Sequence, residues 1–148
     1  MTHPDPEVIR DVSSNFVAVK LKTADHADLA RTFGVRWLPA TVVADATGKA
    51  QHLTVGFLPP AHYRAELCFG RAMEAFARKE YEKAKSLFSE MVERHPKTER
   101  TAEAQYWAGV IALRQTRDFN RCKEAWKRIP DDFPGTTWAA KVEWALQG

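Results

Sequence analysis

The hydrophobic pattern changes at Pro59 and Pro60, and this change constrains the fold more than any other feature of the 148-residue chain. Before the two prolines, short Val-rich runs alternate with short helical patterns. After them, apolar residues recur three or four positions apart, which is the spacing of amphipathic helices. We therefore expect an α/β part over residues 1–60 and an all-α part over residues 61–148.

The first part begins with a predicted helix and a predicted strand. In "DPEV", Asp5 suits the N-cap and Pro6 the first helical position, and the helix is expected to end near Ser13. The next segment, "NFVAVKLK", alternates apolar and polar residues and is rich in Val. This pattern predicts a strand over residues 16–22.

A second helix and a hairpin complete the first part. "DHADLARTFG" predicts a short helix with Asp25 as its cap and Gly34 in a left-handed position at its end. Two further strands are expected over residues 40–45 and 50–56, joined by the tight turn "DATG". The first part should therefore hold a sheet of three strands.

The second part repeats one helical pattern. Its first stripe and its second stripe lie 38 residues apart, as the distance from Ala84 to Cys122 shows. The first stripe consists of Tyr81, Ala84, Leu87, Phe88 and Met91, and the second of Phe119, Cys122, Trp126 and Ile129. We expect two helical hairpins, ended by Pro96 and Pro134, and a closing helix in "TTWAAKVEWAL".

This helical part resembles tetratricopeptide repeats over roughly residues 64–148. That family places a small residue in its first helix, and a small residue, an aromatic residue and a proline in its second. The matching residues are Ala72, Ala84, Phe88 and Pro96 in one unit, and Gly109, Cys122, Trp126 and Pro134 in the next. The resemblance implies antiparallel helix pairs stacked into a short superhelix, whose concave face is suited to binding protein segments.

The stretch "FGVRWLPATVVADATGKAQHLTVGFLPPAHYRAEL" resembles the C-terminal part of a thioredoxin fold. In that family a cis-proline loop precedes an antiparallel hairpin and a last helix, and Pro39 takes the cis-proline position. The resemblance implies that Trp37, Leu38 and Pro39 form a loop that can receive an extended peptide at the backbone of Leu38. The alternative is that this loop is a turn that only orders Trp37 and Leu38.

The chain departs from the thioredoxin pattern in two ways. It has no Cys-x-x-Cys motif, and the strand that leads into that motif would lie before Met1. In the family that strand is interior, between the strands that correspond to residues 16–22 and 40–45. Its loss would leave unpaired backbone groups across about 10 Å, twice the usual strand spacing. The two strands could pair directly, a strand of a second copy or another protein could fill the gap, or the natural chain could be longer.

The sequence gives few signs of chemistry. Cys68 and Cys122 have no neighbouring cysteine, so we expect buried small side chains at helix contacts rather than a redox pair. The five histidines follow no metal-ligand spacing, and we assign neither a metal nor a cofactor. The net charge of +3 is mild and the signs alternate, which argues against nucleic-acid binding.

Neither a membrane helix nor a signal peptide is expected. No run approaches the roughly 20 apolar residues of a spanning helix, and the segment "MTHPDPEVIRD" lacks an apolar core. We therefore expect a soluble, cytoplasmic protein, provided that its natural start is not upstream.

Exposed aromatic and arginine side chains are the usual anchors of protein interfaces. Tyr106 and Trp144 fall outside the apolar stripes, and together with Arg71 and Arg114 they are candidates for an interaction surface. The sequence thus favours a thioredoxin-like and tetratricopeptide-like interaction module for a protein or peptide, without redox activity of its own. Completion of its sheet by a second copy would make it a homodimer. The alternative is the C-terminal part of a thiol–disulfide oxidoreductase whose cysteines lie upstream of Met1.

Overall fold

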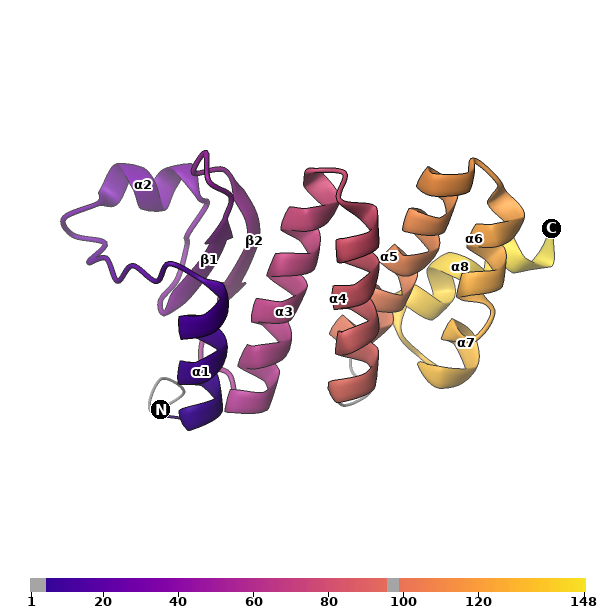
Figure 1. Cartoon of the computed structure of the whole chain (residues 1–148). Coiled ribbons are helices and arrows are strands. Elements are labelled where there is room, and N and C mark those ends of the chain that lie inside the picture. The colour runs from indigo at the N-terminus through magenta and orange to yellow at the C-terminus, as the bar shows by residue number, and fades with distance from the viewer. Residues whose placement is uncertain (1–4, 96–98) are drawn as a thin grey trace.

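A small antiparallel hairpin is attached to one end of a row of helices (Figure 1). This computed structural model describes residues 5–95 and 99–148. The predicted combination of an α/β part and a helical part is therefore observed. Pro96, the predicted end of one helix, lies outside the described residues.

Helix α1, Pro6–Asn15, begins as its sequence predicts. The carboxylate of Asp5 accepts hydrogen bonds from the backbone N–H groups of Glu7 at 2.9 Å and Val8 at 3.1 Å. These bonds satisfy two of the donors that a helix start leaves unpaired. The helix continues two residues past the predicted end at Ser13.

The predicted strand over residues 16–22 is wrong, and so is the three-stranded sheet. This segment carries no strand, and the described residues form a two-stranded sheet of β1 and β2. The alternation of Val and Lys suits a strand, but a strand also needs a neighbour that pairs with its backbone. Direct pairing of residues 16–22 with β1, one of the three arrangements considered, is therefore not observed.

Strands β1, Ala40–Ala44, and β2, Ala50–Val55, form the predicted hairpin. Their antiparallel register pairs Ala40 with Val55. The carboxylate of Asp45 orders the turn by accepting the backbone N–H groups of Thr47 at 2.9 Å and Lys49 at 3.1 Å. Gly48 adopts a φ of +83°, which side chains other than glycine rarely adopt.

Helix α2, Ala27–Thr32, precedes the hairpin. Gly34 follows it with a φ of +69°, as predicted for the residue after a helix end. The predicted cap at Asp25 is wrong, because the N-cap residue is His26 and no side chain caps the helix.

The helical part contains the two predicted helix pairs and the closing helix, together with one short helix that was not expected. The first pair is α3, Pro60–Ala77, and α4, Tyr81–Arg94. The second is α5, Glu99–Thr116, and α6, Phe119–Trp126. The unexpected α7, Ile129–Asp132, then leads to the closing helix α8, Thr137–Gln147.

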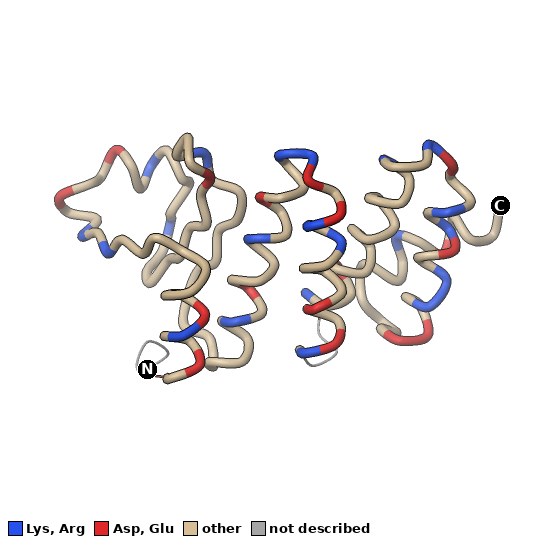
Figure 2. The backbone as a smooth tube through the Cα atoms, in the orientation of Figure 1, with Lys and Arg blue, Asp and Glu red and all other residues tan. Residues whose placement is uncertain are grey.

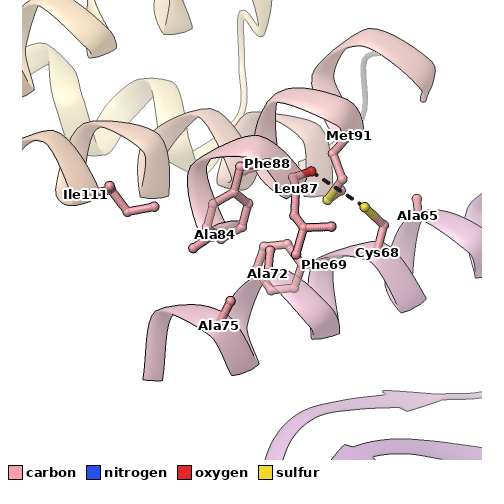
Figure 3. Packing of buried hydrophobic residues seen from close by; sticks show 11 residues of the cluster. Ala65, Cys68, Phe69, Ala72, Ala75, Ala84, Leu87, Phe88, Met91 and Ile111 are labelled. Atoms are coloured by element: carbon pink, nitrogen blue, oxygen red, sulfur yellow. Dashed lines mark hydrogen bonds between the residues drawn. The ribbon is translucent and has the colours of Figure 1, made fainter. Parts of the chain in front are cut away.

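Two hydrophobic clusters hold the helices together. The first lies between α3, α4 and α5 and includes the predicted stripe residues Ala84, Leu87, Phe88 and Met91 (Figure 3). The second lies between α5, α6, α7 and α8 and includes Cys122, Trp126 and Ile129. Phe119, predicted as part of this stripe, is instead exposed.

Helix α3 also carries the hairpin. A Cβ atom added to Gly70 would lie 2.6 Å from Cγ2 of Val43, so the absence of a side chain at Gly70 lets β1 approach α3 closely. The hydroxyl groups of Thr41 and Tyr63 are hydrogen-bonded at 3.0 Å. One face of β1 is therefore packed on α3, and its other face points away from α3.

Candidate protein-interaction site

Four exposed apolar residues lie at the open end of the hairpin, and we call them the hairpin-end patch: Trp37, Leu38, Val55 and Phe57. Trp37 and Phe57 are 72% and 82% exposed. Large apolar residues that are exposed close together are characteristic of interaction sites.

The hairpin itself brings the two halves of this patch together. Ala40 pairs with Val55, and the backbone N–H of Gly56 donates to the carbonyl of Pro39 at 2.7 Å. Leu38 and Phe57 therefore follow on adjoining backbone segments. The peptide bond between Leu38 and Pro39 is cis, as the resemblance implied for this position.

The sequence analysis named Trp37, Leu38 and Pro39 but missed Val55 and Phe57. Counting outward from the turn at Asp45 and Gly48 would have given the wrong pairing, because the register of the two strands shifts by one residue between Val43 and Ala44. The observed register places the residues after β2 opposite those before β1.

Next to the patch lies an apolar groove with a volume of about 660 Å³. One wall is the extended segment after α1, in which Val17, Val19 and Leu21 line the groove and Lys20 does not. Val17 is 95% exposed. This segment therefore has the one-sided apolar pattern of a strand without being part of a sheet.

The opposite walls of the groove come from α2 and from β1. Leu29 and Phe33 contribute from α2 and the residue after it, and Ala40, Val42 and Ala44 contribute from the face of β1 that points away from α3. Leu38 of the hairpin-end patch also lines the groove, so the two features are continuous.

Both sides of the groove present unpaired backbone. In residues 5–95 and 99–148, no hydrogen bond involves the backbone of residues 17–21. Within the same part of the chain, β1 has only β2 as a neighbour. The backbone groups of Pro39 and Asp45 form their hydrogen bonds on the side of β2. Because backbone groups alternate in direction along a strand, those of Ala40 and Val42 point to the free edge of β1.

The groove is almost free of charge. His26 and Asp45 are the titratable side chains among its lining residues. Hydrogen bonds, chiefly from the hydroxyl group of Thr47, lower the pKa of Asp45 from 3.8 to about 2, so its carboxylate is anionic at neutral pH. Figure 2 shows that Lys, Arg, Asp and Glu lie on the helices and loops, while the two strands carry none.

The two thiols do not line this groove. Cys68 belongs to the first hydrophobic cluster, where its Sγ donates to the carbonyl of Leu87 at 3.6 Å (Figure 3), and Cys122 belongs to the second. Burial raises the pKa of each thiol to about 11. Because the thiolate is the nucleophile in disulfide exchange, neither side chain is poised for that chemistry.

A cluster of charged residues fixes the hairpin against the helices. Glu66 of α3 contacts Nε2 of His52 on β2 at 2.6 Å and accepts a hydrogen bond from Nε of Arg100 on α5 at 3.0 Å. The guanidinium of Arg100 also lies 4.5 Å from the ring centre of Phe69, a cation–π contact. Burial acts to raise the pKa of Glu66, but its bonds to His52 and Arg100 outweigh burial and lower the pKa to about 2. Sequence reasoning missed this cluster.

The remaining predicted surface residues are not gathered in one place. Tyr106 is half-buried, because its ring stacks on Trp126 with centres 4.8 Å apart, which corrects its prediction as a surface aromatic. Trp144 on α8 is 71% exposed, and Arg114 near the end of α5 is exposed. Arg71 is half-buried on α3, and Figure 1 shows α3 and α8 far apart along the helical row.

Two other classes of site, a metal site and a membrane-spanning helix, are not found among the described residues. Among the described residues, no group of three His, Cys, Asp or Glu side chains is placed to hold a metal ion. Within that same part of the chain, every helix is too short or too polar to span a membrane.

Comparison of the chain with protein-family models, with curated proteins and with solved structures found no match. The thioredoxin-like and tetratricopeptide-like resemblances therefore stay proposals.

Proposed function

We propose that this chain is a protein-interaction module that binds a partner protein through the hairpin-end patch and has no redox activity of its own. In this proposal the hairpin and α3 belong to a thioredoxin-like unit, and α3–α8 are a short tetratricopeptide-like array that supports it. The observation that carries the proposal is the gathering of four exposed apolar residues at the end of the hairpin.

The chemistry of the patch supports a protein partner. Aromatic side chains dominate the binding energy of protein interfaces, and Trp37 and Phe57 are largely exposed to solvent. The hairpin and the Glu66 cluster hold this surface on a packed scaffold, so little ordering is needed on binding. The burial of Cys68 and Cys122 supports the absence of redox activity.

The binding test uses an unfolded probe protein, reduced and carboxymethylated α-lactalbumin, with affinity measured by titration calorimetry. Trp37→Ser and Phe57→Ser should each weaken binding about tenfold or more, the usual effect of truncating an interface anchor. Trp144→Ser is the matched control, since Trp144 is 71% exposed against 72% for Trp37 but lies on α8. Equal weakening by Trp144→Ser would overturn the proposed surface.

A second measurement tests the absence of redox activity. The 148-residue protein should not reduce insulin in the presence of dithiothreitol above the rate of dithiothreitol alone. Turnover that disappears in a Cys68→Ala, Cys122→Ala double variant would overturn this part of the proposal.

A further inference from the structure

The groove beside the hairpin-end patch is built like a position in a sheet from which a strand is missing. The free edge of β1 and the unpaired backbone of residues 17–21 face it, and apolar side chains line it. Unpaired backbone groups beside apolar surface are costly unless a partner covers and pairs them. An extended segment placed there could bond to β1 on one side and to residues 17–21 on the other.

We infer that this groove receives an extended apolar strand of another protein, which pairs with the free edge of β1. The inference rests on the proposed function and names the class of partner segment. It adds main-chain pairing to the side-chain contacts of the hairpin-end patch, with which the groove is continuous through Leu38.

The charge of the groove determines the composition of the inserted strand. A charged side chain facing Val19 or Val42 would lose its water without gaining a counter-charge, which is costly. Asp45 at the end of β1 supplies the negative charge of the lining, so a basic residue of the strand is favoured at that end. The inserted strand is therefore uncharged along its length, with Lys or Arg at the end beside Asp45.

Both faces of the inserted strand would be covered. The side chains on one face of the inserted strand would lie beside Ala40 and Val42, which line the groove. The side chains on its other face would lie beside Thr41 and Val43, which pack on α3. Strands covered on both faces are continuous runs of Val, Ile and Leu rather than alternating ones.

This requirement argues for another protein over a second copy of this chain. The unpaired extended segment that a second copy could supply is residues 17–21, and it alternates Val19 with Lys20. Insertion of that segment would bring a lysine to one of the two covered faces.

The test uses a fluorescein-labelled peptide of five consecutive Val and Ile residues with a terminal Lys, and binding is followed by fluorescence anisotropy. A second peptide carries N-methyl groups on alternate amides, which removes hydrogen-bond donors along one edge and keeps the side chains. A third alternates Val with Lys. The second and third peptides should each bind at least tenfold more weakly than the first.

Matched protein variants locate the binding in the groove. Val19→Asn places a polar group on the wall, while Ala18→Asn makes a comparable change at the adjacent residue, which does not line the groove. Val19→Asn should weaken binding of the first peptide at least tenfold, and Ala18→Asn should change it less than twofold. Hydrogen exchange should slow at the amides of Ala40 and Val42 when the peptide is bound.

Absence of binding, equal binding of the N-methylated peptide, or equal effects of Val19→Asn and Ala18→Asn would each overturn the inference. A dimer in light scattering, with the amides of residues 17–21 protected without peptide, would assign the groove to a second copy and also overturn it. Loss of lactalbumin binding in Trp37→Ser with none of the groove effects would leave the proposed function standing and reject only the strand. If neither the lactalbumin series nor the peptide series showed its expected effect, both the proposed function and the inserted strand would be rejected.

Discussion

Replacing Gly109 by Ala should destabilise the protein, although Ala is the better helix former. Gly109 lies on α5 against the indole of Trp126 on α6. A Cβ atom at this position would overlap Nε1 of Trp126 and lie 2.5 Å from its Cδ1. The ring has little room to retreat, because it is 5% exposed and stacks on Tyr106.

The expected cost follows from three contributions to the free energy of unfolding. Replacing Gly by Ala inside a helix stabilises by about 1 kcal/mol. Overpacking of a buried site costs about 1–3 kcal/mol. Displacement of the indole breaks the 2.8 Å hydrogen bond from Nε1 of Trp126 to the carbonyl of Tyr106. An unsatisfied buried donor costs about 1–3 kcal/mol. The net expectation is a destabilisation of about 3 kcal/mol, within a range of about 1–5 kcal/mol.

Urea unfolding followed by far-ultraviolet circular dichroism measures this change. The control is the same substitution in a Trp126→Phe protein, which has no indole nitrogen to displace. In that background the cost of Gly109→Ala should fall by at least about 1 kcal/mol, the energy of the coupling between the two sites. A neutral or stabilising Gly109→Ala, or an equal cost in both backgrounds, would refute the reasoning.

Three further predictions concern charge, thiols and a helix cap. Stability should fall as the pH drops from about 4.5 to about 2, because the pKa of Glu66 is lowered from 4.5 to about 2 and its ionised form favours the folded state. In urea unfolding at pH 5 and pH 2.5, Glu66→Gln should reduce this loss, and the exposed Glu143→Gln should not. Ellman's reagent at pH 8 should label Cys68 and Cys122 only after unfolding, because burial raises the pKa of both to about 11; fast labelling of the native protein would contradict this. Asp5→Ala should destabilise α1 by about 1 kcal/mol, because the N-cap hydrogen bonds are lost. Hydrogen exchange at the amide of Val8 should then be about fivefold faster, as heteronuclear NMR can measure.

Features governed by local chemistry could be predicted from the sequence. Asp5 with Pro6 gives the start of α1, and Asp45 with Gly48 gives the hairpin turn. The stripe of Ala84 and its neighbours gives the buried face of α4. In each case a few adjacent residues, or one helical period, contain all the information that the element needs.

Features that depend on distant partners could not be predicted. Residues 16–22 have the pattern of a strand, but only a neighbouring strand would make them one. In the Glu66 cluster, Glu66 contacts His52, which lies 14 positions earlier in the sequence, and Arg100, which lies 34 positions later. Nothing in the local sequence at His52 or Arg100 indicates these contacts. Tyr106 lies outside the apolar stripe of its helix, yet the position of Trp126 makes it part of the packing.

Because α3 belongs to two packing units, the patch and the groove cannot be cut out at the point where the sequence pattern changes. One side of the helix receives the hairpin at Gly70, and another receives α4 through Ala72 and Phe69. A fragment that ends before Pro60 would keep every residue of the patch but lose the surface that gives the hairpin its shape. The smallest portable version of this binding unit therefore extends at least through α4, and grafting it onto another scaffold means transferring a helix pair along with the hairpin.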